Sequence, residues 1–333
     1  MDLKGKKVLV TGAGGFIGRK LVEALQRQEA HVRVLSRSSI GIDRQKVELF
    51  TADLTSKENS LDESLRDVAV VFNCAGELHN PQHMYKLHIG GTERLLIAAK
   101  TEVLRKGTPI HWVQAGSIGS YGPPSSGSTD VSVTECSPTD PFGPYEKSKT
   151  LADELVMRSA QDGLLTFSIV RIANVFGLEM TNRSLFSLIH SLQERLFFFI
   201  GPPGSSANYI HIENVIGGLL LAATHPRAKG EIYNLSNSCS MEHLVDVISA
   251  DLGRPRPKIR LPYQIAFIIS GLSKIIPRFP LTPTRVSALA NRTRYPIDKI
   301  VKELGYSYSL SLEEGVRELV QDYKAYHQLK SRE

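Results

Sequence analysis

Cysteines are few in this sequence, and long hydrophobic runs are absent. The three cysteines, Cys74, Cys136 and Cys239, lie far apart without CxxC or CxxH spacing, so the sequence indicates neither a disulfide framework nor a zinc or other metal site. No apolar run reaches the roughly 18 residues that a membrane-spanning helix needs, and the charged start MDLKGKK is not a secretory signal. We therefore expect an intracellular, cytoplasmic protein that holds no metal.

Acidic residues are almost missing from residues 254–302. This segment has eleven Lys or Arg against the single acid Asp298, whereas the whole chain of 333 residues has 40 basic and 34 acidic residues, a net charge of +6. Such a basic segment suits a polyanion, a membrane surface or a phosphorylated small ligand. It contains no recognisable nucleic-acid-binding motif, so we expect no nucleic acid partner.

The first half of the chain alternates β-branched runs with amphipathic stretches, within a composition (41% apolar, 22% charged) that is ordinary for a folded protein. The expected strands and helices are, in turn, 6–12, 31–37, 47–53, 68–76, 110–117 and 167–177, and 16–28, 83–102 and 145–160. This alternation predicts an α/β fold, a Rossmann-like, doubly wound parallel sheet with helices on both faces. Ligands of such sheets bind at the carboxyl ends of the strands.

A glycine-rich motif, VTGAGGFIG, follows the first expected strand and precedes the first expected helix. It places Gly12, Gly15 and Gly18 three residues apart, with Phe16 and Ile17 opening the helix. Glycines there allow a tight turn and close backbone approach, and the helix N-terminus offers free N–H groups to a pyrophosphate. The motif predicts dinucleotide binding, and the alternative is a tight strand-to-helix turn without a ligand.

An acid is missing at the end of the second expected strand. In dinucleotide-binding units an acid there hydrogen-bonds the ribose 2′-hydroxyl, but this chain has Ser36 and Arg37. A hydroxyl and a guanidinium suit a 2′-phosphate, so NADP(H) is favoured as cofactor over NAD(H), which stays open. In the alternative interpretation, Arg37 is a solvated surface charge.

The pattern changes after about residue 178. We expect helices at 182–195 and 213–225 and a strand at 231–236, and from 239 onward a mostly helical chain interrupted by seven prolines between 255 and 296. The predicted division is a dinucleotide-binding Rossmann domain and a smaller, mostly helical C-terminal substrate-binding lobe. The domain comprises 1–178 and receives approximately 209–238, and the lobe comprises 179–208 and 239–333.

Several further motifs are spread over nearly the whole chain. They are TGAGGFIG, Asp53 with Leu54, Ala75 with Gly76, GSIGSYG at 116–122, Tyr145 to Lys149, VRIANVFG at 170–177, YIHIENV at 209–215, and LGY with LEEGV from 304. Together they resemble the extended short-chain dehydrogenase/reductase family and, within it, the NAD-dependent epimerase/dehydratase group. The tail also resembles the 3β-hydroxysteroid dehydrogenase branch. The resemblance implies that Asp53, Leu54, Ala75 and Gly76 contact the cofactor.

A tyrosine four residues before a lysine occurs three times, so spacing alone selects none of the pairs. They are Tyr145 with Lys149, Tyr295 with Lys299 and Tyr326 with Lys330. The family resemblance selects the first, because in that family the active pair opens a helix after a Pro/Gly loop and a serine lies some 25 to 30 residues upstream. Ser117 lies 28 residues before Tyr145.

The resemblance implies catalytic roles for Ser117, Tyr145 and Lys149. Tyr145 would move a proton to or from the substrate oxygen, Ser117 would hydrogen-bond that oxygen, and Lys149 would hold the nicotinamide ribose, so Tyr145 and Lys149 also contact the cofactor. Residues i and i+4 of a helix share one face, so we expect the lysine ammonium to lower the pKa of the tyrosine.

The chain departs from the family pattern at three places. His88 stands where the family often has Asn, either as a hydrogen bond to the same backbone or as part of a proton relay. Residues 205–208 lack the arginine that sugar-nucleotide epimerases usually carry there. Ile118 and Gly119 replace the acids that dehydratases use, so dehydration is disfavoured.

We expect the apolar, cation-flanked segment 261–281 either to cap the substrate cleft or to make a peripheral membrane contact.

The resemblance also implies a homodimer through helices 83–102 and 145–160. For function we expect an NAD(P)-dependent oxidoreductase acting on a ring carbinol or ketone of a nucleotide-activated sugar, as a 4-keto reductase or 4-epimerase. The alternatives are a 3β-hydroxysteroid or lipid-type alcohol dehydrogenase and a non-catalytic dinucleotide-binding subunit.

Overall fold

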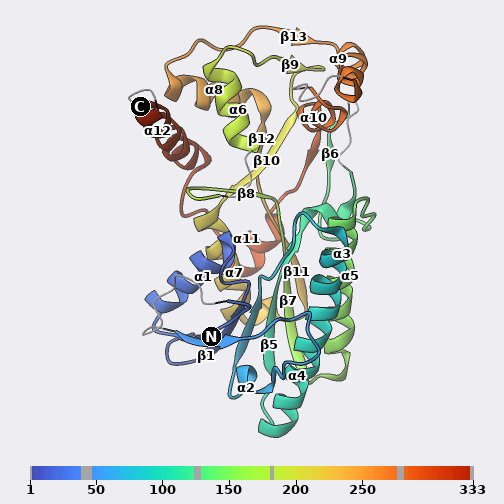
Figure 1. Cartoon of the computed structure of the whole chain (residues 1–333), viewed down its shortest axis with the longest axis vertical. Helices are drawn as coiled ribbons and strands as arrows, with labels where there is room; N and C mark the ends of the chain where they lie inside the picture. Colours follow the sequence, from blue (N-terminus) through green and yellow to red (C-terminus); the bar gives the residue numbers. More distant parts are fainter. Residues whose placement is uncertain (1, 39–46, 124–128, 181–183, 276–280, 331–333) are drawn as a thin grey trace.

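A large parallel sheet organises the lower part of the molecule in the computed structural model, which describes residues 2–38, 47–123, 129–180, 184–275 and 281–330 (Figure 1). Its strands are β1 (Lys7–Thr11), β2 (His31–Ser36), β3 (Glu48–Thr51), β4 (Val70–Asn73), β5 (Ile110–Ser117), β7 (Leu165–Ile172) and β11 (Glu231–Leu235). The seven strands are all parallel and lie in the order β11-β7-β5-β4-β1-β2-β3. The predicted doubly wound α/β sheet is therefore confirmed.

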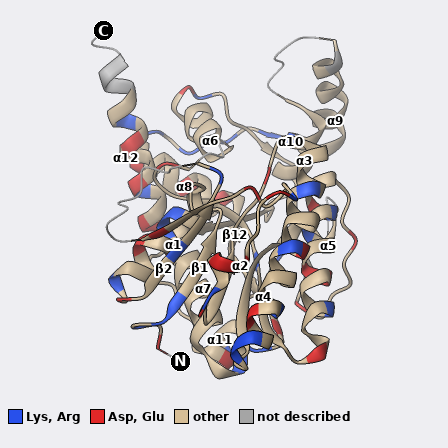
Figure 2. Cartoon of the chain, turned by 60° about the horizontal axis from the view of Figure 1, so that its bottom comes forward, with Lys and Arg blue, Asp and Glu red and all other residues tan. Residues whose placement is uncertain are grey.

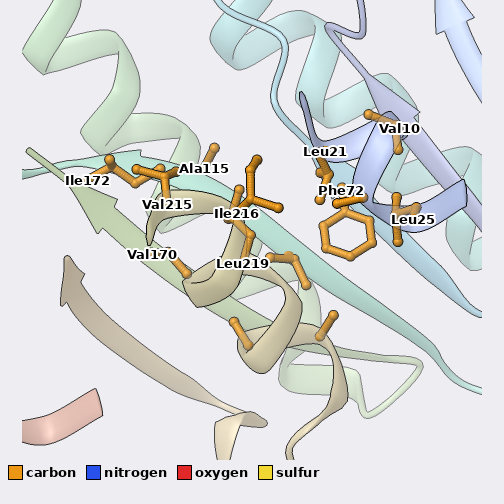
Figure 3. Packing of buried hydrophobic residues seen from close by; sticks show 14 of the residues in the cluster. Val10, Leu21, Leu25, Phe72, Ala115, Val170, Ile172, Val215, Ile216 and Leu219 are labelled. Atoms are coloured by element: carbon orange, nitrogen blue, oxygen red, sulfur yellow. The ribbon is translucent and has the colours of Figure 1, made fainter. Parts of the chain in front are cut away.

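Helices cover both faces of this sheet because successive strand residues point to opposite sides. One face packs on α1 (Phe16–Arg27), α7 (Ile212–Thr224) and α11 (Asp298–Leu304), and the other on α2 (Asp62–Leu65), α4 (Thr92–Lys106) and α5 (Pro144–Ser159). Val8 and Val10 of β1 belong to the first cluster, and Leu9 belongs to the second. Figure 3 shows Leu21 and Leu25 of α1 and Leu219 of α7 meeting the strand side chains.

The predicted helix over 83–102 is longer than expected and changes its winding. It consists of α3 (Pro81–Tyr85), a π-helical stretch η1 (Lys86–Gly91) and α4. Asn80 caps its start by accepting the N–H of His83. A π-helical turn is rare and is often found at functional sites, and this one buries His88 beside α5.

A second lobe covers the carboxyl ends of the strands (Figure 1). Its elements include β8 (Asn174–Phe176), α6 (Ser184–Gln193), β9 (Phe199–Ile200), β10 (Ser206–His211), β12 (Asn237–Ser240), α8 (Met241–Leu252), β13 (Arg260–Leu261), α9 (Tyr263–Ser270), η5 (Gly271–Lys274), α10 (Pro283–Leu289) and α12 (Leu312–Lys330). Strands β8, β10 and β12 form a small sheet, and α6, α8 and α12 pack a separate apolar core on it. Short pieces complete the fold: η2 (Ile118–Tyr121), β6 (Val131–Ser132), η3 (Ala160–Asp162), η4 (Pro226–Ala228) and β14 (Thr293–Arg294).

The chain crosses between the core of the large sheet and the core of the second lobe more often than the positions of its prolines predict. The strand expected over 167–177 is two strands, since β7 stays in the large sheet while β8 pairs with β10. Helix α11, which lies in the segment assigned to the substrate lobe, adds Ile300 and Leu304 to the core of the large sheet. We propose that the division into a dinucleotide-binding domain and a substrate lobe holds with α11 counted in the former.

Candidate active site

The glycine loop after β1 is packed so closely that side chains do not fit at two of its positions. A Cβ on Gly12, whose φ is +69°, would lie 2.6 Å from the carbonyl oxygen of Cys74, and one on Gly18 would lie 2.2 Å from the carbonyl oxygen of Gly12. The loop thus rests against Cys74 and Ala75, which follow β4, while Gly76 lies next to His88. Gly15 has more room, 3.2 Å from the Gly12 oxygen, and precedes α1.

The N-terminus of α1 has the character of an anion site. Gly15 is the N-cap and makes no side-chain hydrogen bond to the helix, the first turn has no acidic residue, and Gly14 and Gly15 are exposed. Phe16 and Ile17 pack against apolar clusters and hold the helix start in place. Free N–H groups and the positive end of the helix dipole suit a pyrophosphate, so the loop fits a dinucleotide.

Ser36, Arg37 and Asp53 come together at the carboxyl ends of β2 and β3. Ser36 ends β2, and Arg37 follows it on the surface. Partial burial raises the pKa of the Asp53 carboxyl, but hydrogen bonds from Thr55 and the charge of Arg37 outweigh it and hold that pKa below its ordinary value. Arg37 therefore has an acidic neighbour, although none occurs at its own strand end.

The turn of Asp53 and Leu54 is fixed by a cation that the sequence analysis missed. Arg94 of α4 donates hydrogen bonds to the carbonyl oxygens of Asp53 at 3.3 Å and Leu54 at 2.8 Å. Leu54 is buried and lies against Gly91, where a Cβ would be 3.1 Å away. Leu54 is thus part of the wall between β3 and α4.

A buried polar network holds the ends of β1, β4 and β5 together, and sequence reasoning missed it as well. The Asn73 side chain accepts from Thr11 Oγ1 at 2.7 Å. It donates to Thr92 Oγ1 at 3.0 Å and to Gln114 Oε1 at 3.1 Å. Thr11 also accepts the N–H of Ala75 at 3.2 Å. A satisfied buried network of this kind fixes the floor of the predicted cofactor site.

Ser117, Tyr145 and Lys149 lie near one another at the end of β5 and the start of α5. Ser117 ends β5, and its Oγ accepts the N–H of Gly119 at 3.1 Å. Tyr145 stands in the first turn of α5, close enough to Ser117 for that side chain to affect its pKa. Lys149 lies one turn further along and is buried, with 5% of its surface exposed. The pairs Tyr295–Lys299 and Tyr326–Lys330 lie on other elements, β14 to α11 and α12.

The expectation that Lys149 lowers the pKa of Tyr145 is wrong. Burial raises the pKa of Tyr145 to about 12, the charges of Glu146 and Asp153 act in the same direction, and the hydrogen bond to Ser117 opposes them only in part. The Lys149 ammonium donates instead to the carbonyl oxygen of Ala115. Tyr145 therefore carries its proton over the whole neutral range.

Lys149 lies in an environment that disfavours its charge. Burial lowers the pKa of its ammonium, while the charge of Asp153 and the nearby Cys74 act in the opposite direction without cancelling the effect. Burial also raises the pKa of the Cys74 thiol to about 12, so that thiol is neutral. The charge state of Lys149 consequently depends on Asp153.

His88 acts as a structural residue in this geometry. Its Nε2 accepts the N–H of Glu77 at 2.9 Å, so the ring proton of the neutral histidine lies on Nδ1, which is 2.8 Å from Ser148 Oγ. Ser148 in turn donates to the carbonyl oxygen of Tyr145 at 3.0 Å. Burial and the charge of Lys149 lower the pKa of His88 to about 3. A neutral His88 thus fixes the first turn of α5.

The segment 205–208, which lacks the expected arginine, is buried in the second lobe. Asn208 donates to the carbonyl oxygen of Thr293 at 2.8 Å and accepts from Ser238 at 2.6 Å. Ser205, Ser206 and Ala207 are also buried. The segment supplies no cation to a ligand.

Several cations of residues 254–302 are neutralised by acids from other parts of the chain. The ion pairs are Arg256–Asp246, Arg260–Glu242, Arg292–Asp130 and Lys299–Glu231. The local excess of positive charge is therefore smaller in the folded chain than in the sequence.

The helix α9 and the turn η5 expose large apolar side chains at the far edge of the second lobe, and Figure 2 shows no charged residue on α9. The exposed side chains are Ile265 (48%), Phe267 (48%), Ile268 (76%), Leu272 (42%) and Ile275 (79%). The inner face, with Ala266 and Ser270, is buried. Of the predicted segment 261–281, residues 276–280 lie outside the described part. Within the described ranges, no helix combines the length and apolar character needed to cross a membrane.

Comparison with known proteins adds three similarities. A family model described as the NAD dependent epimerase/dehydratase family matches residues 8–236. The chain is 25% identical over 342 residues to a sterol-4-alpha-carboxylate 3-dehydrogenase (decarboxylating) of Mus musculus, with 96% of this chain and 91% of that protein covered. It is 26% identical over 270 residues to a dTDP-6-deoxy-L-talose 4-dehydrogenase (NAD(P)(+)) of Kitasatospora kifunensis, with 77% and 82% covered.

A solved structure has the same fold. It is that of a short-chain dehydrogenase/reductase superfamily protein from Agrobacterium tumefaciens with bound NAD, which has a TM-score of 0.74, 20% sequence identity, and coverage of 98% of this chain and 100% of that one.

Proposed function

The chain belongs to the NAD dependent epimerase/dehydratase family and is an NAD(P)-dependent enzyme of the short-chain dehydrogenase/reductase type, and on that premise we propose that it reduces or oxidises a hydrophobic ketone or alcohol. The observation that carries the proposal is the meeting of Ser117, Tyr145 and Lys149 beside the glycine loop. The dinucleotide, when bound, supplies or accepts the hydride.

The proposed mechanism follows from the protonation states at the site. The protonated Tyr145 hydroxyl donates a proton to a carbonyl oxygen as it becomes an alkoxide, and Ser117 Oγ orients that oxygen. Lys149 holds the ribose of the cofactor and offsets negative charge that develops on Tyr145. Since the pKa of Tyr145 is raised, the protonated form that donates in the reduction predominates at neutral pH.

Two observations support a hydrophobic substrate over a nucleotide-activated sugar. Several cations of residues 254–302, whose charge suggested a phosphorylated substrate, are paired with acids in the fold. Residues 205–208 are buried and contain no cation. The relative that the chain matches over 96% of its length is named as a sterol dehydrogenase. A sterol-like ring ketone or the corresponding alcohol is therefore the proposed substrate class.

A nucleotide-activated sugar is the second candidate, acted on by a 4-keto reductase or a 4-epimerase. It is favoured by the similarity to a dTDP-sugar 4-dehydrogenase, although that match covers 77% of this chain. Exposed cations such as Lys258 and Arg294 could meet a diphosphate.

NADP(H) is the proposed cofactor. Ser36 and Arg37 lie at the end of β2, where they can meet a 2′-phosphate, while Asp53 of the next strand end is already engaged by Thr55. NAD(H) stays the alternative, since the family takes its name from it.

We also propose two assembly properties. The exposed α9 and η5 rest on an anionic membrane surface, with exposed cations Lys258 and Arg285 near them in sequence.

A homodimer forms through α4 and α5, where Ile97 and Leu151 are exposed large apolar side chains.

The experiment that tests the function has two stages. The purified chain is denatured, released nucleotide is identified by mass spectrometry, and affinities for NADP(H) and NAD(H) are measured by calorimetry. Hydrophobic ketones and keto-sugar nucleotides are then compared as substrates. A chain that purifies empty and prefers NADPH supports the reductase, whereas stoichiometric bound NAD supports an epimerase and overturns the roles given to Ser36 and Arg37.

A further inference from the structure

Three charged side chains are buried directly behind the proposed catalytic residues. Lys149 is 5% exposed, Asp153 is 0% exposed and Arg171 is 4% exposed. Asp153 lies one turn after Lys149 and two turns after Tyr145 on the same face of α5. Burying charges this completely is costly unless they compensate one another, so their arrangement requires an explanation.

The carboxylate of Asp153 is poorly bonded for a residue with only a structural role. Arg171 Nε is 3.6 Å from Asp153 Oδ2, beyond hydrogen-bond range, and among the described residues neither carboxylate oxygen has a hydrogen-bond partner. Arg171 is drawn to a second partner, since its guanidinium carbon lies 4.7 Å from the ring centre of Tyr121. Asp153 therefore contributes charge more than it contributes hydrogen bonds.

The location of the carboxylate connects it to Lys149. A Cβ on Gly116 would lie 3.1 Å from Asp153 Oδ2, so the carboxylate rests against β5 at Gly116. The preceding residue, Ala115, accepts the hydrogen bond of Lys149, and the following residue is Ser117. The register of β5 and β7 places Arg171 beside Gly116.

We propose that Asp153 is a positioning residue, whose buried charge keeps Lys149 protonated at the carbonyl oxygen of Ala115, two residues before Ser117. This role rests on the proposed function, because it presupposes that Lys149 acts there as an ammonium. Arg171 holds Asp153 in place from the opposite side.

The groups that surround Asp153 determine its own ionisation. They are Tyr145, Lys149 and Glu154 on α5, Arg171 on β7 and Tyr121 on η2, with Cys74 after β4 and His88 on η1 next to Lys149. Burial raises the pKa of Asp153 to about 6, against the opposing charges of Lys149 and Arg171. Below that pH Asp153 becomes neutral, and Lys149 loses the charge that favours its protonated form.

The test is an NMR titration of Lys149 in the full chain with labelled lysine, assigned with Lys149→Met. In Asp153→Asn we expect Lys149 to lose its proton at lower pH than in the wild type. Asp162→Asn removes a carboxylate from the turn that follows α5, where it pairs with Lys100, and should leave the Lys149 titration unchanged. An equal titration in Asp153→Asn and the wild type would overturn the proposal.

Two further readouts keep the test decisive. If Asp153→Asn does not fold, the wild-type Lys149 signal still decides, because it should show a step near pH 6 as Asp153 titrates, and a flat signal there overturns the role. Calorimetry with NADPH separates a failure of the proposed function from a failure of the role given to Asp153. A wild type that does not bind dinucleotide contradicts the proposed function, whereas normal binding with an unchanged Lys149 titration contradicts only the role of Asp153.

Discussion

Helices α5 and α9 depart from the usual distribution of side chains in opposite ways. The inner face of α5 buries Ser148, Lys149, Thr150 and Asp153, which are polar or charged. The outer face of α9 exposes Ile265, Phe267 and Ile268, which are apolar. Buried polar groups and exposed apolar patches are the informative exceptions to hydrophobic burial, and α5 and α9 are examples of the two kinds.

The difference between the two helices indicates what each one serves. A buried charge costs free energy in folding, so its retention on α5 fits a role in chemistry. An exposed apolar face costs solubility, and its retention on α9 fits contact with a hydrophobic partner.

The largest effect is expected from removal of the Tyr145 hydroxyl. Tyr145→Phe should lower kcat by about a thousandfold, because a positioned proton donor contributes on the order of 10² to 10⁴ in rate. Its affinity for NADPH should stay within about twofold, since the cofactor loop is untouched. Steady-state kinetics and calorimetry give the two numbers. Tyr326→Phe, at another Tyr-x-x-x-Lys pair, is the matched control and should behave as the wild type.

The pH dependence should differ between the two directions of the reaction. Since the pKa of Tyr145 is raised to about 12, its protonated form predominates between about pH 7.5 and 9.5. Reduction, which uses that form, should be nearly constant in this range, while kcat/KM for oxidation should rise about tenfold per pH unit. An oxidation rate that is already level at about pH 7.5 would show that the tyrosine has the lowered pKa predicted from sequence.

A charge on the outer face of α9 should weaken membrane contact. Ile268→Glu is expected to reduce flotation with anionic vesicles about tenfold, because it puts a carboxylate into the apolar patch and adds repulsion from the lipid. Val301→Glu puts the same charge on an exposed apolar side chain (41%) of α11, a helix outside both α9 and the proposed dimer contact. It should float like the wild type. Equal losses in both variants would mean that the effect is not specific to α9.

The smallest effect is expected from a change at Arg37, which is proposed to meet the 2′-phosphate of the cofactor. Arg37→Asp should shift preference from NADP(H) toward NAD(H) by about tenfold in the ratio of affinities, since a carboxylate repels the 2′-phosphate and can accept from a 2′-hydroxyl. Measuring both cofactors on the same protein controls for damage to the fold. If the ratio does not change, Arg37 is a solvated surface charge.

Much of the sheet can be predicted from the sequence, because strand and helix alternation is a local pattern and the glycine loop is a short motif. Tyr145 with Lys149 is different, since its spacing occurs three times and only the family resemblance selects this pair. The strand over 167–177 was predicted as one element because nothing in its composition marks Ala173 as the point where β8 leaves the large sheet.

The remaining features depend on contacts between distant residues. The π-helical turn at η1 is not visible in hydrophobic periodicity, and the bonds of His88 join two elements 60 residues apart. Asn73 finds Thr11 and Gln114 through the order of the strands. The cations of residues 254–302 find acids as far away as Asp130, so sequence charge overestimated what a phosphorylated substrate would meet.

The central claim is hydride transfer to a hydrophobic carbonyl with Tyr145 as proton donor. It is tested most directly by incubating the protein with NADPH deuterated at C4 of the nicotinamide, together with hydrophobic ketones and keto-sugar nucleotides, and weighing the products by mass spectrometry. The account predicts one deuterium at the carbinol carbon of a hydrophobic alcohol with the wild type and none with Tyr145→Phe. Deuterium found only in sugar products would contradict the substrate class, and no transfer from a tightly bound cofactor would contradict the account itself.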